Sequence, residues 1–170
     1  MSDDELLLES ARFRVVRRSR RSADGREYTK DAILHPGAVA VVPILDSGQV
    51  CLIRNYRLAV ERALIEVPAG TLEVGEPPEA TARRELAEET GYVAGELRHL
   101  TTFYMSPGIL NERMHVFVAT GLRPGPATRE LGEEIDNLLV AWEEALTMIR
   151  DGRIEDGKTI AALLFYDKLR

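Results

Sequence analysis

Three carboxylates in this sequence are spaced so that they could hold a metal ion. Glu85, Glu88 and Glu89 occupy positions i, i+3 and i+4 of the segment RELAEETG. In an α-helix, side chains at this spacing share one face and lie within about one turn of each other. Like charges placed this way repel and weaken an isolated helix. Helix stability therefore does not explain this cluster of acids, and a chemical reason is needed to explain it.

A hard divalent cation is one such reason. Mg²⁺ and Mn²⁺ prefer oxygen ligands, and Mg²⁺ is commonly held by a few carboxylates, waters and substrate phosphates. Arg84 precedes Glu88 by four residues, so it can pair with that carboxylate and orient it. A solvated acidic helix surface is the commoner origin of such a pattern, and these residues alone leave both interpretations open.

Signals around the acids predict the helix that would carry them. Pro77 and Pro78 suit its first turn, where backbone amides have no partner within the helix. Gly91 suits a left-handed cap at its C-terminal end. Three apolar residues are expected to seat this helix on a sheet, namely Ala80 and Ala87 opposite the acids and Leu86 on the flank.

The segments around this helix have the pattern of strands. AVAVVPIL (38–45) is a valine-rich apolar run, typical of a buried strand. QVCLIRNYR (49–57) follows a DSG turn and is expected to be its hairpin partner, and ALIEVPAG (63–70) to be one further strand. Strands are also predicted at 97–104 and 115–119, and helices at about 143–150 and 159–169. This order indicates an α+β fold with a mixed sheet.

The N-terminal segment is expected to form a separate antiparallel β-strand extension. ARFRVV (11–16) alternates apolar and basic residues, and Asp24-Gly25 predicts a hairpin turn before EYTKDAILH (27–35). The stretch from 11 to 26 holds seven arginines and one aspartate, which favours a solvated hairpin over a nucleic-acid contact. We therefore divide the chain into an extension (1–35), expected to serve in dimerisation, and a main domain (36–170).

Composition excludes several classes of protein. The chain has 170 residues, of which 45% are hydrophobic and 29% charged, as in an ordinary globular domain. Its net charge of -6 argues against a nucleic-acid partner, and no apolar run approaches the ~18 residues of a membrane span. The single cysteine, Cys51, is expected to be buried in a strand, and Trp142 and Phe165 in the core. With an acidic N-terminus instead of a signal peptide, we expect a cytoplasmic protein.

The wider spacing of the acidic segment resembles a known family. GTLEVGEPPEATARRELAEETGY (70–92) matches the Nudix box, GX5EX7REUXEEXGU, at every fixed position. The one departure is Tyr92, which replaces the usual bulky aliphatic residue at the end of the box. The resemblance implies a Nudix fold, an α/β/α sandwich with a mixed sheet. It also implies Mg²⁺- or Mn²⁺-dependent hydrolysis of a nucleoside diphosphate linked to another group.

The resemblance implies roles for the polar residues at the fixed positions of the box. The implied ligands of two to three metal ions are Glu85, Glu88, Glu89 and the backbone carbonyl of Ala69. Arg84 is implied to orient these carboxylates, and Glu76 to support the loop before the helix.

Segments outside the box resemble one branch of the family. Pro107 lies 15 residues beyond the end of the box, a mark of the ADP-ribose and ADP-sugar pyrophosphatases. HPGAVAVV, LIRNYR, IEVPAGTLE and GRIEDGKTIAALLFYDKL are similar to the same branch. The implied products from ADP-ribose are AMP and ribose 5-phosphate. YMSPG and DGKT are equally similar to GDP-mannose pyrophosphatases, so GDP-mannose or another nucleotide-linked substrate, RNA caps included, is the alternative. A non-catalytic nucleotide-binding regulator is less favoured because the box is intact.

Hydrolysis also needs a carboxylate that orients or deprotonates water. In this branch that acid lies on a loop after the box, here RELGEEIDN. Glu133 aligns best with it, and Glu130 and Glu134 are the alternatives.

Further residues are implied to bind substrate. Arg57 matches an arginine that contacts the diphosphate, a task that suits a guanidinium fork, and Arg54 is its alternate. Glu112 matches an acid that binds the terminal ribose, while Glu66 and Glu73 are weaker candidates for metal or substrate contact. Members of the branch are homodimers with swapped N-terminal strands that help to bind the partner's substrate, so the resemblance implies such a dimer here. It also leaves open a third interpretation of the stretch from 11 to 26, in which some of its arginines meet the nucleotide.

Overall fold

The computed structural model describes residues 4–125 and 135–169. Its strands are β1 (Glu5–Glu9), β2 (Arg14–Arg21), β3 (Glu27–Leu34), β4 (Ala38–Pro43), β5 (Gln49–Arg57), β6 (Arg62–Glu66), β7 (Ala69–Thr71), β8 (Tyr92–Val93), β9 (Glu96–Tyr104), β10 (Arg113–Thr120), β11 (Arg123–Pro124) and β12 (Ile135–Ala141). Its helices are α1 (Pro78–Thr90), α2 (Trp142–Arg150) and α3 (Gly157–Leu169), with a 3₁₀ turn at Leu58–Val60. Among the described residues, no helix is long and apolar enough to cross a membrane.

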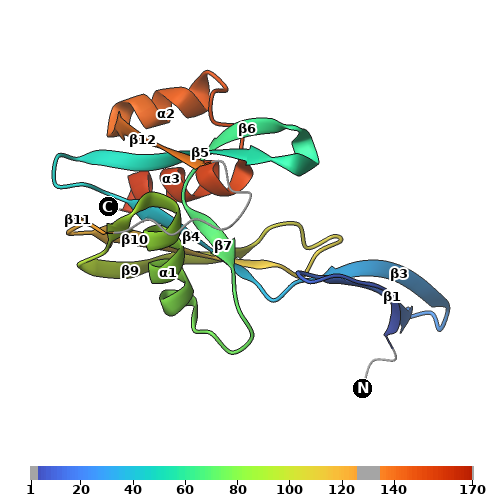
Figure 1. The fold of residues 1–170 in the computed structure, drawn as a ribbon. Coiled ribbons are helices and arrows are strands. Elements are labelled where there is room, and N and C mark those ends of the chain that lie inside the picture. Colours follow the sequence, from blue (N-terminus) through green and yellow to red (C-terminus); the bar gives the residue numbers. More distant parts are fainter. Residues whose placement is uncertain (1–3, 126–134, 170) are drawn as a thin grey trace.

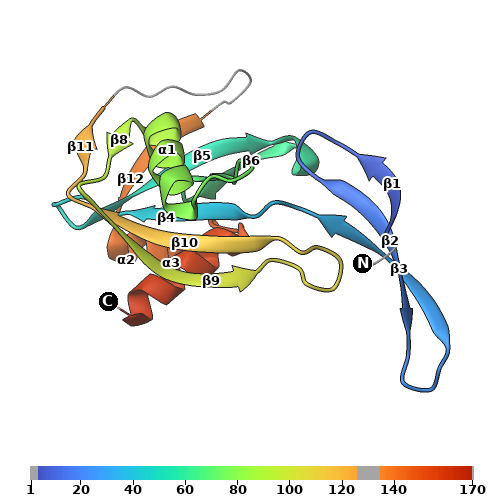
Figure 2. The same ribbon diagram turned by 90° about the horizontal axis from the view of Figure 1, so that it is seen from below.

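The main body is an α/β/α sandwich, which confirms the expected α+β architecture. A mixed sheet has the order β7-β4-β10-β9, in which β4 and β10 are parallel and the other pairs antiparallel. A second, antiparallel sheet has the order β12-β5-β6. Helix α1 covers one face of the mixed sheet, and α2 and α3 lie on the opposite side (Figures 1 and 2).

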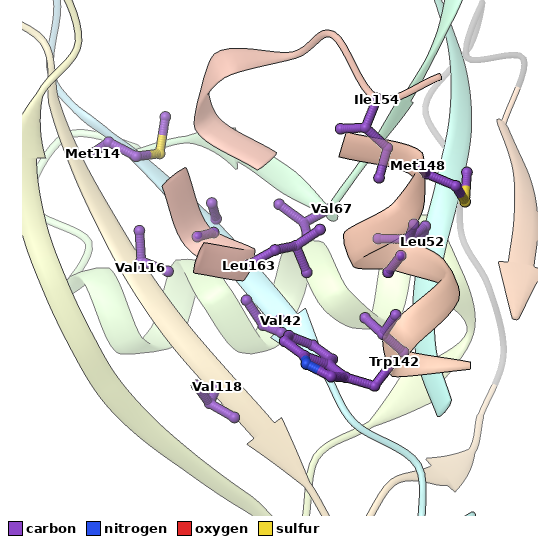
Figure 3. Close-up of a cluster of buried hydrophobic side chains, with 14 of the residues drawn as sticks. Val42, Leu52, Val67, Met114, Val116, Val118, Trp142, Met148, Ile154 and Leu163 are labelled. Carbon is purple, nitrogen blue, oxygen red and sulfur yellow. The ribbon is translucent and has the colours of Figure 1, made fainter. Parts of the chain in front are cut away.

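Strand β4 is apolar throughout because both of its faces are buried. Ala38, Ala40 and Val42 belong to the larger core cluster, beneath α2 and α3 (Figure 3). Val39 and Val41 point the other way, into a smaller cluster beneath α1. Since successive side chains of a strand alternate between faces, a continuous apolar run fits a strand between two layers.

Helix α1 has the predicted ends but a different packing stripe. Pro77 is its N-cap, and Gly91 closes it with a φ of 73°. Ala82 and Leu86 are fully buried against the sheet, whereas Ala80 is exposed. The expectation that Ala80 helps to seat the helix is wrong, because a step of two residues turns the helix by about 200° away from the buried stripe.

Two predicted strand arrangements are also wrong. β4 and β5 share only an isolated bridge between Ile44 and Val50, because both edges of β4 are occupied by β7 and β10. The predicted strand 63–70 is divided into β6 and β7, which belong to different sheets. Val67 and Pro68 form the crossing, and Pro68 has no backbone N–H to donate to a ladder.

The first three strands form an antiparallel sheet, β1-β2-β3, that lies to one side of the sandwich (Figure 2). β2 and β3 pair across the predicted Asp24-Gly25 turn. The sheet meets the main body through Ile33, which exchanges backbone hydrogen bonds with Ile109 and Asn111.

Expectations for the core are confirmed for two of three residues. Cys51 is fully buried, and this burial raises the pKa of its thiol to about 12. Trp142 is buried and packs edge-on against Tyr166. Phe165, expected in the core, is 41% exposed and stacks on Phe103 instead, because it lies on the outer side of α3.

Candidate active site

A cavity of about 600 Å³ brings together most of the predicted site residues. Its walls come from α1, β7 and the loop after it, the end of β5, the segment between β9 and β10, and the start of α3. The predicted residues that line it are Arg57, Ala69, Glu73, Arg84, Glu85, Glu89 and Glu112. Arg54 and Glu88 are absent from the described lining, and Arg54 is exposed on β5. Glu133, Glu130 and Glu134 lie outside the described residues.

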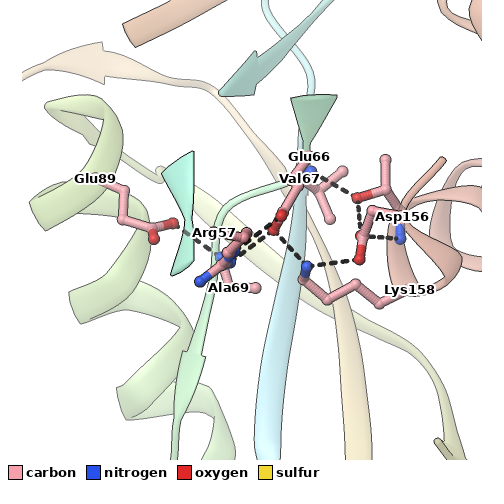
Figure 4. Close-up of polar contacts among 8 residues, drawn as sticks. Arg57, Glu66, Val67, Ala69, Glu89, Asp156 and Lys158 are labelled. Carbon is pink, nitrogen blue, oxygen red and sulfur yellow. Dashed lines mark hydrogen bonds and ion pairs between the residues drawn. The ribbon is translucent and has the colours of Figure 1, made fainter. Parts of the chain in front are cut away.

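Glu89 is held against the strand that α1 covers. Its side chain is only 3% exposed, and Oε2 accepts a 2.9 Å hydrogen bond from the backbone N–H of Ala69 (Figure 4). A buried carboxylate is costly unless it is hydrogen-bonded or paired. This contact fixes one box acid at the start of β7, beside the residue whose carbonyl is an implied ligand.

Glu85 occupies the space that Gly70 leaves open. A Cβ atom added to Gly70 would lie 2.0 Å from the Glu85 carboxyl carbon, far inside van der Waals contact. The first glycine of the box is therefore needed for the close approach of this carboxylate to the backbone. Two acids of one helix face thus meet two successive residues of β7.

Arg84 forms hydrogen bonds with three acids of the box. Its Nη1 donates to Glu85 Oε1 at 2.8 Å and to Glu88 Oε2 at 2.9 Å, so the predicted pair with Glu88 is present. Its Nε and Nη2 donate to Glu76 at 3.3 and 3.2 Å. The hydrogen bond with Glu76 is the largest cause that raises the pKa of Arg84 above its usual value.

The donor set suits a hard cation. Over residues 4–125 and 135–169, no three acidic, histidine or cysteine side chains converge closely enough to hold a metal ion as they are placed. The Arg84 guanidinium lies between Glu85 and Glu88 instead. Carboxylate oxygens with a nearby backbone carbonyl are nevertheless ligands that Mg²⁺ and Mn²⁺ prefer, and Glu85 and Glu89 already face the cavity.

Arg57 lines the cavity from the end of β5 and forms an ion pair with a buried acid, Glu66. Its Nε and Nη2 donate to the two carboxylate oxygens of Glu66 at 2.9 and 2.6 Å (Figure 4). Arg57 keeps 37% of its side chain exposed, while Glu66 keeps 1%. Burial alone would raise the pKa of Glu66, but Arg57 and Lys158 outweigh it and hold that pKa below its usual value. Glu66 therefore binds Arg57 as a charged carboxylate, although it is absent from the described lining of the cavity.

Asp156 and Lys158 line the cavity from the start of α3 but have no role in the sequence-based predictions. Lys158 pairs with both Glu66 and Asp156. Both residues belong to the segment DGKT, whose resemblance to the family implies no role for them. A lysine in the first turn of a helix lies next to the positive end of the helix dipole, which is unfavourable. This unfavourable placement is the signal in the sequence that points to a special role for Lys158.

The cavity lining also includes residues from distant parts of the chain. Glu112 is one of these residues, with Oε1 3.8 Å from Nδ1 of His35. Ala11 and Arg12, from the turn between β1 and β2, line the same cavity. Glu85 and Glu89 line the cavity from α1, and Arg57 lines it from the end of β5. Figure 4 shows Arg57 on the side toward which the Glu89 carboxylate points. Such a cavity can hold a divalent cation next to a guanidinium that fits a diphosphate.

Comparison with known proteins gives consistent results. The family model of the NUDIX domain matches residues 34–163. The chain is 41% identical to the ADP-ribose pyrophosphatase of Bacillus subtilis (strain 168) over 144 residues, 84% of this chain and 78% of that protein. Over the same shares, it is 38% identical to the methanol dehydrogenase activator of Bacillus methanolicus. It is 36% identical to the GDP-mannose pyrophosphatase of Enterobacter sp. (strain 638) over 138 residues, 76% of this chain and 72% of that protein.

A solved structure supports the fold. A crystal structure of an ADP compounds hydrolase superposes with a TM-score of 0.87 at 24% sequence identity, covering 98% of this chain and 90% of that one.

Proposed function

Because the chain belongs to the NUDIX domain family and is a hydrolase, we propose that it cleaves the diphosphate of ADP-ribose or a related ADP-sugar. The products from ADP-ribose are AMP and ribose 5-phosphate. One observation carries this proposal: Glu85 and Glu89 of α1 line the same cavity as the Arg57 guanidinium, which lies across from Glu89 in Figure 4. A diphosphate between them meets metal-binding oxygens on one side and a fork of N–H donors on the other.

Different residues of the cavity and of the segments around it have different proposed roles. Glu85, Glu88, Glu89 and the Ala69 carbonyl are the proposed ligands, with Arg84 orienting the carboxylates. Two to three Mg²⁺ or Mn²⁺ ions bound there would neutralise phosphate charge and supply an activated water. Arg57 binds the diphosphate, with Arg54 as alternate, and Glu112 binds the terminal ribose. Glu133 is proposed as the base that orients water, and Glu130 and Glu134 remain alternatives.

GDP-mannose is the second candidate substrate, because relatives named for that activity match a similar share of the chain. Another relative is named for activation of a different enzyme. The intact set of box acids supports turnover over a purely regulatory role.

The substrate is tested by comparing kcat/KM for ADP-ribose and GDP-mannose in Mg²⁺, with products resolved by chromatography. We expect AMP from ADP-ribose with a kcat/KM at least about tenfold higher, a difference of about 1.4 kcal/mol in transition-state binding. Faster release of GMP from GDP-mannose would move the specificity to the second candidate. No turnover of either, or of UDP-glucose and NADH, would contradict the proposal.

We further propose that residues 1–35 form a dimerisation element whose strands exchange with a partner copy. The edge strand β1 supports this, since Leu6, Leu7 and Leu8 are all exposed on it. Large apolar side chains on an exposed edge strand mark an interaction surface. Light scattering at micromolar protein should give about twice the 19.0 kDa mass of one chain.

Variants make that test specific. Leu7→Glu should shift the mass toward the monomer, because it introduces a charge into the proposed interface. Leu169→Glu, at an exposed leucine of α3 outside residues 1–35, should leave the mass unchanged. A wild-type monomer would contradict the exchange.

A further inference from the structure

Arg57 belongs to a network of charged side chains that are buried or partly buried (Figure 4). It joins the end of β6 to the start of α3, segments 92 residues apart in the sequence. Its members are two cations, Arg57 and Lys158, and two acids, Glu66 and Asp156. The four charges balance, so a network at the edge of the cavity carries no net charge.

Glu66 is the shared member of this network. One of its oxygens accepts from Arg57 alone, and the other accepts from both Arg57 and Lys158. With 1% of its side chain exposed, Glu66 has little access to water as an alternative partner. A buried carboxylate with several charge-assisted donors is fixed in orientation. Its orientation in turn sets the direction in which Arg57 presents its remaining N–H groups.

Lys158 connects this pair to a rigid anchor. Its Nζ also pairs with Asp156 Oδ1 at 3.0 Å. Asp156 Oδ2 accepts from the backbone N–H and the hydroxyl of Thr159 at 2.9 and 2.6 Å, which caps α3. The Thr159 hydroxyl accepts a 2.9 Å bond from the Val67 N–H, immediately after Glu66. Thr159 is itself fully buried.

We propose that Lys158 is a positioning residue for Arg57, acting through Glu66. This inference rests on the proposed function, in which Arg57 binds the substrate diphosphate. Arg57 is more than a third exposed, so Lys158 is the more buried of the two cations that hold Glu66. Without Lys158, the Glu66 carboxylate loses its side-chain tie to α3 while the backbone bond from Val67 to Thr159 remains, and we expect the Glu66–Arg57 side-chain pair to move as a unit. Two acids then face one guanidinium, so the cavity wall becomes negative toward an anionic substrate.

A double-mutant cycle tests whether Lys158 acts through Arg57. Lys158→Met should lower kcat/KM for the preferred nucleotide sugar by about 30-fold, mainly through KM, because losing one partner of a buried charge pair weakens binding strongly. In an Arg57→Lys background the same change should cost less than about threefold. Arg57→Lys is chosen because it leaves Glu66 a cation. An equal loss in both backgrounds would overturn the proposal.

Lys168→Met is the matched control. Lys168 lies on the same helix, is 78% exposed and pairs with its neighbour Asp167. Its kcat/KM should stay at the wild-type value. A loss comparable to that of Lys158→Met would show a general effect of charge on α3 and would overturn the proposal.

A ligand-free measurement separates this inference from the proposed function. The NMR order parameter of the Arg57 Nε–H group should be near the rigid value of about 0.85 in the wild type and fall below about 0.6 in Lys158→Met. If Lys158→Met does not fold, Asp156→Asn keeps an oxygen for the Thr159 cap and should lower the order parameter in the same direction. An unchanged value in the folded variant overturns the proposal. Absence of turnover in a wild type with a rigid Arg57 would count against the proposed function alone.

Discussion

Replacing Glu89 with Gln should abolish most turnover while leaving the fold intact. Gln keeps the side-chain volume and an oxygen that can accept the Ala69 N–H bond, so the anchor to β7 is retained. It removes the negative charge of a proposed metal ligand. Since metal ions contribute several kcal/mol to such reactions and each 1.4 kcal/mol is tenfold, we expect kcat to fall at least about 100-fold.

Steady-state kinetics in Mg²⁺, with the thermal midpoint measured in parallel, check this expectation. Glu79→Gln is the matched control, because Glu79 lies on the same helix but is exposed and pairs with Arg83. The control should keep wild-type activity. Full activity of Glu89→Gln in the presence of metal would remove the basis for a metal site on this helix face.

Gly70→Ala should lower kcat/KM by about 10- to 100-fold, although it adds a single methyl group. That methyl group would lie 2.0 Å from the Glu85 carboxyl carbon, so the carboxylate must move. Misplacing a group of an active site by about 1 Å can cost on the order of 100-fold. The backbone of Gly70 lies outside the left-handed region, so no loss of activity is attributed to φ strain.

Gly108→Ala provides the comparison for this substitution. A Cβ atom at Gly108 meets nothing within 4 Å, and its φ also lies outside the left-handed region. Both variants should show cooperative unfolding close to that of the wild type, and Gly108→Ala should remain fully active. If Gly70→Ala were equally active, the carboxylate of Glu85 would have no part in the reaction.

The local features of the site could be predicted from the sequence. The box acids are i, i+3 and i+4 neighbours, so one helix is enough to bring them together, and the caps of α1 follow from Pro77 and Gly91. Pairing of Arg84 with Glu88 needs only four residues of separation. Such short-range rules do not depend on the rest of the fold.

Long-range arrangements could not be predicted in the same way. The order β7-β4-β10-β9 depends on which strands occupy the edges of β4, and no local pattern specifies it. Sequence alone could therefore not reveal that β4 and β5 belong to different sheets. The role of Lys158 could not be predicted for the same reason, because its partner Glu66 lies 92 residues away in the sequence. Only the folded chain, which places the start of α3 next to the end of β6, brings the two together.

The most direct test of the central claim is the release of AMP from ADP-ribose by the purified protein, measured with Mg²⁺ and with excess EDTA. We expect equimolar AMP and ribose 5-phosphate in Mg²⁺ and loss of at least about 99% of the rate in EDTA, because the proposed mechanism requires a divalent cation at the carboxylates of the cavity. An undiminished rate in EDTA, or no AMP with either Mg²⁺ or Mn²⁺, would contradict it.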